Sequence, residues 1–183
     1  MSEFIKILDE AAGKAGFDLT PQQLEQFDTY YRMLVETNKV MNLTALTEPQ
    51  DVAVKHLMAY DTYFPGKVLA DVGTGAGFPG IPLKIFCPSL KVVLIDSLAK
   101  RLNFLQNVIE ALQLQNIECV HLRAEDAGKN AAHREKYDIV TARAVARLSV
   151  LAEYCLPLVK TGGMFIALKG SKYKEEINDA AKA

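Results

Sequence analysis

The chain has 183 residues, a formal net charge of −1 and 50 % hydrophobic residues, as expected for one globular domain with or without a small extension. No apolar run reaches the roughly 20 residues that span a bilayer, and the acidic N-terminus is unlike a signal peptide, so we expect a cytoplasmic protein. The near-neutral charge argues against a general polyanion-binding surface, although bases outnumber acids from residue 66 onward.

The first 65 residues are predicted to be helical. Thr20 is a candidate N-cap, proline follows it, and Gln23 stands at the third helical position, before apolar residues at helical spacing. Residues 47–50 repeat this start signal ahead of a further helical pattern. Tyr30 falls on the apolar face of the first pattern, which favours a core position over a surface for stacking bases.

From residue 66 the pattern alternates between short apolar strands and amphipathic helices. Strands are predicted at 68–72, 91–95, 116–121, 137–141 and 163–168. Strand–helix–strand alternation predicts an α/β fold with a doubly wound, mostly parallel sheet. We therefore expect a helical segment at 1–65 followed by an α/β domain at 66–183.

The first predicted strand ends at Asp71 and runs into a glycine-rich loop that contains Gly73, Gly75 and Gly77. Glycine accepts positive φ and has no Cβ, so such a loop can turn sharply and lie against a ligand. Loops of this kind, between a strand and a helix, receive nucleotide-type cofactors in α/β proteins. Asp96 ends the second strand, where a carboxylate suits ribose hydroxyls.

Asp71 favours S-adenosylmethionine (SAM) as the cofactor. A carboxylate beside the glycine loop repels a pyrophosphate but favours the cationic methionine part of SAM, directly or through water. A nicotinamide cofactor, and hence an oxidoreductase, is the alternative, since the glycine spacing also fits the dinucleotide fingerprint. A simple tight turn is the remaining interpretation of the glycines.

The loop after the third strand contains Arg123, Ala124 and Glu125. In a doubly wound fold it lies at the same carboxyl edge as the glycine loop. Its backbone N–H and carboxylate suit an adenine edge, although a solvated charged loop is the plainer interpretation.

Several motifs occur together and in order. They are Asn42-Leu43-Thr44, His56, the glycine loop from Asp71 to Pro82, Asp96-Ser97-Leu98 with Lys100-Arg101, Arg123-Ala124-Glu125, Thr141-Ala142-Arg143-Ala144 and Leu168-Lys169-Gly170. From about residue 17 to its end, the chain resembles the ribosomal RNA small subunit methyltransferase G family, also called glucose-inhibited division protein B. The resemblance implies a SAM-dependent enzyme that methylates N7 of a guanine in the 530 loop of 16S rRNA.

The resemblance also implies cofactor contacts and a partner. The cofactor contacts it implies are Gly73, Phe78, Ala124, Glu125 and Arg143; Asp71, Gly75, Gly77 and Asp96 join them from the arguments above. The partner would be 16S rRNA within the small subunit or an assembly particle, bound by a monomer. Family members continue with two further strands, so we expect the chain to be a fragment or its last strand to be covered by a partner.

Candidates for positioning the substrate are Asn42, His56, Arg123 and Lys169. Basic residues near the predicted strand ends could follow RNA phosphates: Lys100, Arg101, Arg123, Arg147, Lys169, Lys172 and Lys174. Each of these residues also has a plain structural interpretation, a satisfied histidine for His56 and a solvated charge for the lysines and arginines. We expect Arg143 to contact the cofactor carboxylate or an RNA phosphate, the alternative being a surface ion pair with Glu125.

The residues after the fourth strand agree with attack by guanine N7, which holds an in-plane lone pair and loses no proton. Thr141-Ala142-Arg143-Ala144 is not the D/N-P-P-Y element of enzymes that methylate exocyclic amines, and Cys155 falls too late to be a cytosine-C5 nucleophile. No general base is then needed, so positioning and desolvation would supply most of the rate. The histidines and cysteines show no metal-ligand spacing, so no metal is expected. A non-catalytic ribosome-assembly factor with a SAM-type fold remains an alternative.

Overall fold

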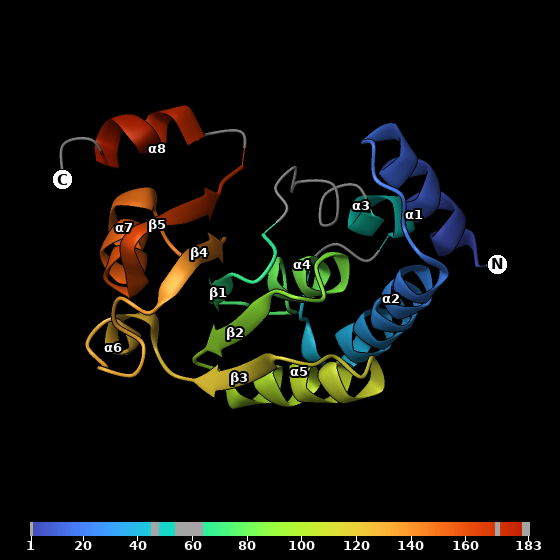
Figure 1. The fold of residues 1–183 in the computed structure, drawn as a ribbon, viewed down its shortest axis with the longest axis horizontal. Helices are drawn as coiled ribbons and strands as arrows, with labels where there is room; N and C mark the ends of the chain where they lie inside the picture. Colours follow the sequence, from blue (N-terminus) through green and yellow to red (C-terminus); the bar gives the residue numbers. More distant parts are fainter. Residues whose placement is uncertain (1, 45–47, 54–63, 171–172, 181–183) are drawn as a thin grey trace.

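A computed structural model describes residues 2–44, 48–53, 64–170 and 173–180. Five parallel strands form one sheet in the order β3-β2-β1-β4-β5 (Figure 1). The strands are β1 (Val68–Val72), β2 (Lys91–Asp96), β3 (Ile117–His121), β4 (Tyr137–Arg143) and β5 (Val159–Leu168). The strand order reverses between β1 and β4, which is where open α/β sheets bind ligands. The doubly wound parallel sheet is thus confirmed.

Helices cover both faces of the sheet, because alternate side chains of each buried strand point to opposite faces. Leu69 and Leu94 point to the face covered by α4 (Gly80–Phe86) and α5 (Ala99–Ala111). Ala70 and Ile95 point to the other face, where α7 (Leu148–Cys155) packs. The short α6 (Ala124–Ala127), the 3-10 helix η2 (Leu156–Leu158) and α8 (Tyr173–Ala180) complete that side (Figure 1).

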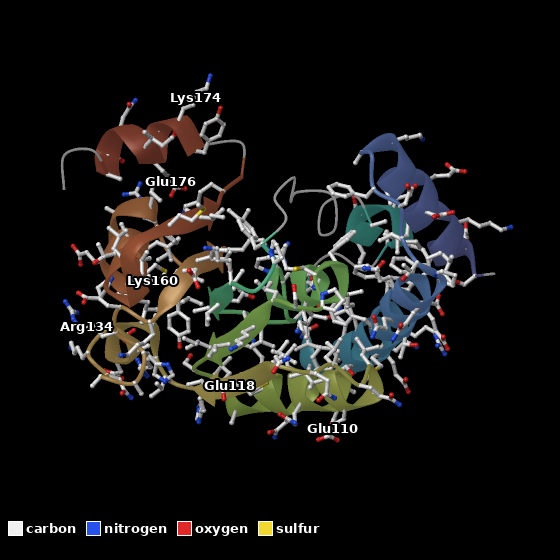
Figure 2. The ribbon with its side chains drawn as sticks, viewed as in Figure 1. Glu110, Glu118, Arg134, Lys160, Lys174 and Glu176 are labelled. Atoms are coloured by element: carbon white, nitrogen blue, oxygen red, sulfur yellow. The ribbon has the colours of Figure 1, made fainter. Side chains whose placement is uncertain are left out.

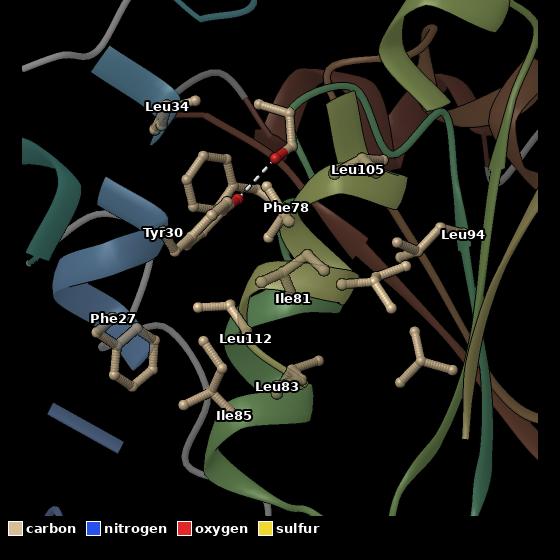
Figure 3. Close-up of a cluster of buried hydrophobic side chains, with 14 of the residues drawn as sticks. Phe27, Tyr30, Leu34, Phe78, Ile81, Leu83, Ile85, Leu94, Leu105 and Leu112 are labelled. Atoms are coloured by element: carbon tan, nitrogen blue, oxygen red, sulfur yellow. Dashed lines mark hydrogen bonds between the residues drawn. The ribbon is translucent and has the colours of Figure 1, made fainter. Parts of the chain in front are cut away.

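The N-terminal helices pack on the α4 and α5 side. They are α1 (Glu3–Lys14), α2 (Pro21–Met41) and the short α3 (Pro49–Val52). The capping box predicted at the start of α2 is present, since Thr20 and Gln23 exchange side-chain to backbone hydrogen bonds. The Gln23 amide also donates to the carbonyl of Ile85 at 2.9 Å, which attaches the start of α2 to α4. Phe27, Tyr30 and Leu34 enter the same buried cluster as α4 and α5 (Figure 3).

The predicted strands are all found, with small differences at their ends. The largest difference is β5, which begins at Val159 instead of residue 163. Gly162 and Gly163 lie in a stretch where the register between β4 and β5 shifts, and the strand continues through them. β5 is the last strand in the sheet order. Within the described ranges, no helix is both long enough and apolar enough to cross a membrane.

Candidate functional site

A cavity of about 280 Å³ opens at the carboxyl ends of the strands. Residues that end or follow β1, β2, β3 and β4 all contribute to its walls. Its lining is Gly73, Ile95, Asp96, Ser97, Arg101, Leu122, Arg123, Ala124, Glu125, Ala144, Val145 and Tyr154. Of the residues predicted to contact a cofactor, Gly73, Asp96, Ala124 and Glu125 line this cavity, and so does Arg123. Its size is near the lower end of small-molecule pockets, about 300 Å³.

The glycine loop connects β1 to α4, and its first half is hydrogen-bonded to β2. The N–H groups of Gly73 and Thr74 donate to the carbonyl of Ile95 at 2.8 and 3.2 Å. The N–H of Gly75 donates to Oδ2 of Asp96 at 2.9 Å. These three amides therefore already have protein acceptors.

The second half of the loop is bonded within itself and to Asp71. The N–H groups of Gly77 and Phe78 donate to the Thr74 carbonyl at 2.9 and 3.2 Å. The N–H of Gly80 donates to Oδ2 of Asp71 at 3.1 Å. In a dinucleotide-binding loop such amides face the pyrophosphate, whereas here they hold the loop itself together.

Asp71 lies beneath the loop and is 0 % exposed. Its Oδ2 also accepts from the Thr74 hydroxyl at 2.6 Å, and its Oδ1 accepts from the Thr141 hydroxyl at 3.0 Å. Burial raises the pKa of Asp71 to about 6, and these hydrogen bonds and the charge of Arg143 offset the burial only in part. Since the side chain has no exposed surface, it acts in this structure through the loop and its charge, and a direct contact with a cofactor stays a prediction.

Asp96 lies at the end of β2 and lines the cavity, and its contact with a ribose stays a prediction. It is 3 % exposed, and Oδ1 accepts from the N–H of Leu98 at 2.9 Å. Oδ2 accepts from Gly75 and from Arg101, the latter at 3.4 Å. The Asp96 carboxylate therefore connects β2 to the glycine loop and to the start of α5. It also lines the cavity.

Gly73 lies at a point of the cavity wall where there is no room for a larger residue. Its φ is +64°, a left-handed conformation that favours glycine, and a Cβ there would lie 2.4 Å from Cγ2 of Val145. Val145 follows β4 and lines the same cavity. The two segments therefore approach closely at this wall of the cavity, where only glycine fits.

Other parts of the cavity wall come from the segment after β3 and from α7. Ala124 and Glu125 begin α6, and Tyr154 reaches the cavity from α7. Arg123 and Glu125 form an exposed ion pair at 3.7 Å. The alternative pairing of Arg143 with Glu125 is therefore not the ion pair seen here. Tyr154 and Val145 were not anticipated, because the sequence does not reveal which residues after β4 turn toward the strand ends.

Phe78 and Arg143 lie together beside the cavity and are not among its lining residues. Phe78 is 2 % exposed, and Cζ of Arg143 lies 5.0 Å from the centre of its ring. Gly75 and Gly77 likewise belong to the loop but not to the cavity wall. Contacts of these residues with a cofactor stay predictions.

The residues predicted to position a substrate have different surroundings. Asn42 ends α2 in a left-handed conformation, with φ of 47°, and is exposed. His56 lies outside the described residues, as does Lys172 in the predicted basic face. The Lys169 ammonium donates to the Ala146 carbonyl and pairs with Glu176, both at 2.6 Å.

Among the residues that the structure describes, no group of three or more histidine, cysteine or acidic side chains is placed to hold a metal ion. Cys155 and Cys119 are free thiols whose pKa values burial raises to about 12 and about 11. Burial therefore favours the protonated thiol form of both over the nucleophilic thiolate.

Comparison with known proteins gives one family. The family model described as rRNA small subunit methyltransferase G matches residues 23–183. The chain is 54 % identical over 180 residues to a "Ribosomal RNA small subunit methyltransferase G" from Lactobacillus acidophilus, covering 93 % of this chain and 74 % of that one. It is 50 % identical to the protein of the same name from Desulforamulus reducens, covering 100 % of this chain and 79 % of that one.

The fold also resembles solved structures at low identity. A precorrin-6y C5,15-methyltransferase from Geobacter metallireducens superimposes with a TM-score of 0.54 at 16 % identity, covering 78 % of this chain and 75 % of that one. At this identity the likeness concerns the fold alone. It is the Rossmann-like fold of SAM-dependent methyltransferases.

Proposed function

Because the chain belongs to the ribosomal RNA small subunit methyltransferase G family, we propose that it methylates N7 of a guanine in the 530 loop of 16S rRNA. The family match covers the glycine loop, the cavity and the strand ends that surround it. The methyl donor is SAM. The substrate is 16S rRNA within the small ribosomal subunit or an assembly particle, and the enzyme acts as a monomer in the cytoplasm.

One observation favours SAM over a nicotinamide cofactor: six amides of the glycine loop already have acceptors in the protein, namely those of Gly73, Thr74, Gly75, Gly77, Phe78 and Gly80. Gly73, Thr74 and Gly75 donate to β2, and Gly80 donates to Asp71. A pyrophosphate would need such amides free, and it would lie close to a carboxylate. SAM carries no phosphate and is cationic at sulfur, so it fits a loop of this kind.

We assign different lining residues to different parts of the cofactor. Asp96 is the acceptor for ribose hydroxyls, and the backbone N–H at Ala124 and the Glu125 carboxylate meet the adenine edge. Leu122 and Tyr154 supply apolar surface for the base. When bound, SAM supplies a methyl group on a positively charged sulfur, which makes that group an electrophile.

The acceptor chemistry asks little of the protein beyond placement. Guanine N7 holds a lone pair and loses no proton when it is methylated, so no side chain is required as a general base. Methylation makes the ring cationic, so an arginine close to N7 would oppose the reaction. Arg143 is held over Phe78, and we assign it to the cofactor carboxylate or an RNA phosphate.

The test is transfer of a tritiated methyl group from SAM to small subunits purified from a strain that lacks the gene. We expect the label in a single guanine of the 530 loop. Cleavage of the RNA chain specifically at N7-methylguanosine should then occur at that nucleotide. Label elsewhere in the RNA or in a ribosomal protein would refute the proposed acceptor. SAM binding without any methyl transfer would instead favour the assembly-factor alternative.

A matched pair of glycine variants makes the assay specific for the cavity. In Gly73→Ala the new Cβ would collide with Val145, so we expect methyl transfer to fall at least about a hundredfold. Gly66 also has a positive φ, +69°, but nothing lies within 4 Å of a Cβ there. Gly66→Ala therefore carries similar backbone strain and should retain the activity.

A further inference from the structure

Tyr30 connects the N-terminal helices to the glycine loop. It lies on α2, is 2 % exposed, and its ring points from α2 toward the loop (Figure 3). Its hydroxyl donates to the carbonyl of Ala76 at 2.6 Å. The two residues are 46 positions apart in the chain, so this contact exists only in the folded protein.

The Tyr30 hydroxyl complements the two carboxylates that hold the loop. Asp71 at the end of β1 binds the loop from below, and Asp96 at the end of β2 binds it at Gly75. Ala76 is the next residue, and its carbonyl is held from α2 instead of from the sheet. The loop is therefore fixed from two sides, and one side belongs to the helical segment.

Gly77 shows how closely Tyr30 approaches the loop. Its φ is +100°, and a Cβ at this position would lie 3.1 Å from the Tyr30 hydroxyl oxygen, 2.7 Å from Ile81 and 2.8 Å from Leu105. The backbone thus passes through a space that only glycine fits, with the phenol as one of its walls. A substitution at Tyr30 would therefore directly alter the contacts of the peptide between Ala76 and Gly77.

The ring of Tyr30 makes a second connection, toward the end of β4. Its centre lies 5.4 Å from that of Phe78 at an interplanar angle of 52°, a favourable tilted arrangement. The guanidinium of Arg143 lies over Phe78. A continuous set of packed side chains therefore runs from α2 through the glycine loop to an arginine beside the cavity.

We infer that Tyr30 is a positioning residue for the cofactor, which holds the glycine loop in the conformation that SAM requires. This inference rests on the proposed use of SAM, and it gives the helical segment a part in the cofactor site. Without the hydroxyl, the Ala76 carbonyl would be buried without its donor, and its peptide would turn to find another. Only a fraction of the molecules would then have the loop in the binding-competent conformation. The apparent Kd for SAM would equal the intrinsic Kd divided by that fraction.

The test compares Tyr30→Phe with Phe27→Leu. Tyr30→Phe removes the hydroxyl and keeps the ring, so we expect the Kd for S-adenosylhomocysteine and the KM for SAM to rise about fivefold to tenfold. We expect kcat at saturating SAM to stay within about twofold, because binding and not the methyl transfer is affected. Phe27 lies on the same helix and is 1 % exposed, but its ring packs on Phe86. Phe27→Leu should lower the unfolding temperature and leave the Kd unchanged.

Equal Kd values for Tyr30→Phe and the unchanged protein would overturn the inference and leave only a structural role. A second measurement needs no variant: S-adenosylhomocysteine should slow amide hydrogen exchange in α2 around Tyr30 as well as in the loop, because the coupling is reciprocal. Unchanged exchange in α2 would also overturn the inference. Failure of the unchanged protein to bind S-adenosylhomocysteine would overturn the proposed function, and this inference with it.

Discussion

At the residue scale, the structure gives Asp71 a different position from the one its sequence context suggests. The carboxylate follows a strand and precedes a glycine loop, which suggested a residue at the cofactor surface. It is instead fully buried and accepts from Thr74, Gly80 and Thr141. Its carboxylate is close to the loop and is not in contact with water. It therefore fixes the loop geometry by hydrogen bonds and makes the electrostatic potential at the loop more negative when it is ionised.

The raised pKa of Asp71 makes a prediction about stability and pH. Because its folded pKa of about 6 exceeds the ordinary 3.8, its contribution to stability is fully present below pH 3.8 and is lost as the pH rises through about 6. Compared with Asp71→Asn, the unchanged protein should lose up to about 3 kcal/mol of unfolding free energy between about pH 4 and 7. Urea unfolding of both proteins across this range measures the difference.

Asp138 provides a control of opposite sign. Its hydrogen bond with Lys160 lowers its pKa, so its contribution is present at neutral pH and is lost as the pH falls through the lowered value. The unchanged protein should therefore gain stability relative to Asp138→Asn as the pH rises through the acidic range. The account would be contradicted if the unfolding free energy of the unchanged protein, relative to Asp71→Asn, stayed constant or increased as the pH rises from about 4 to 7.

At the element scale, the polar contacts of Glu176 attach α8 to the rest of the fold, together with the packing of α8 on α7. None of the residues of α8 is buried. Glu176 points from α8 toward α7, whereas Lys174 points outward (Figure 2). No side chain of α7 caps its own N-terminus; instead, Oε2 of Glu176 accepts from the N–H of Leu148 at 2.9 Å. The same carboxylate pairs with Lys169.

This arrangement predicts that α8 docks through Glu176. In Glu176→Gln the ion pair with Lys169 is lost, so amide hydrogen exchange over residues 173–180 should rise clearly. Glu175 is the adjacent acid and is exposed, so Glu175→Gln removes the same charge from the same helix without this contact. Hydrogen exchange read by mass spectrometry compares the two. Equal protection of α8 in both variants would show that Glu176 does not hold it.

At the scale of the whole molecule, the sheet could be predicted from the sequence because each strand and crossover helix has its own local pattern. The same holds for Gly73 and Asp96, which are adjacent in sequence to the ends of predicted strands. The predicted lining residues Ala124 and Glu125 follow from the same rule, since the carboxyl ends of parallel strands meet at one edge.

The remaining features depend on contacts between distant parts of the chain. Thr141 reaches Asp71 from 70 residues away, and no local pattern announces that pairing. Tyr154 lies on α7, and which of its faces meets the cavity depends on how α7 packs on the sheet. The bonded state of the loop amides is also a tertiary property, because Ile95 and Asp96 belong to the neighbouring strand.

The most direct test of the central claim is calorimetric titration of the protein with S-adenosylhomocysteine and, separately, with NAD. If the loop amides are committed to the protein and Asp71 lies beneath them, S-adenosylhomocysteine should bind in the micromolar range and NAD should not bind measurably. Tight binding of NAD, with S-adenosylhomocysteine unable to compete, would contradict the account.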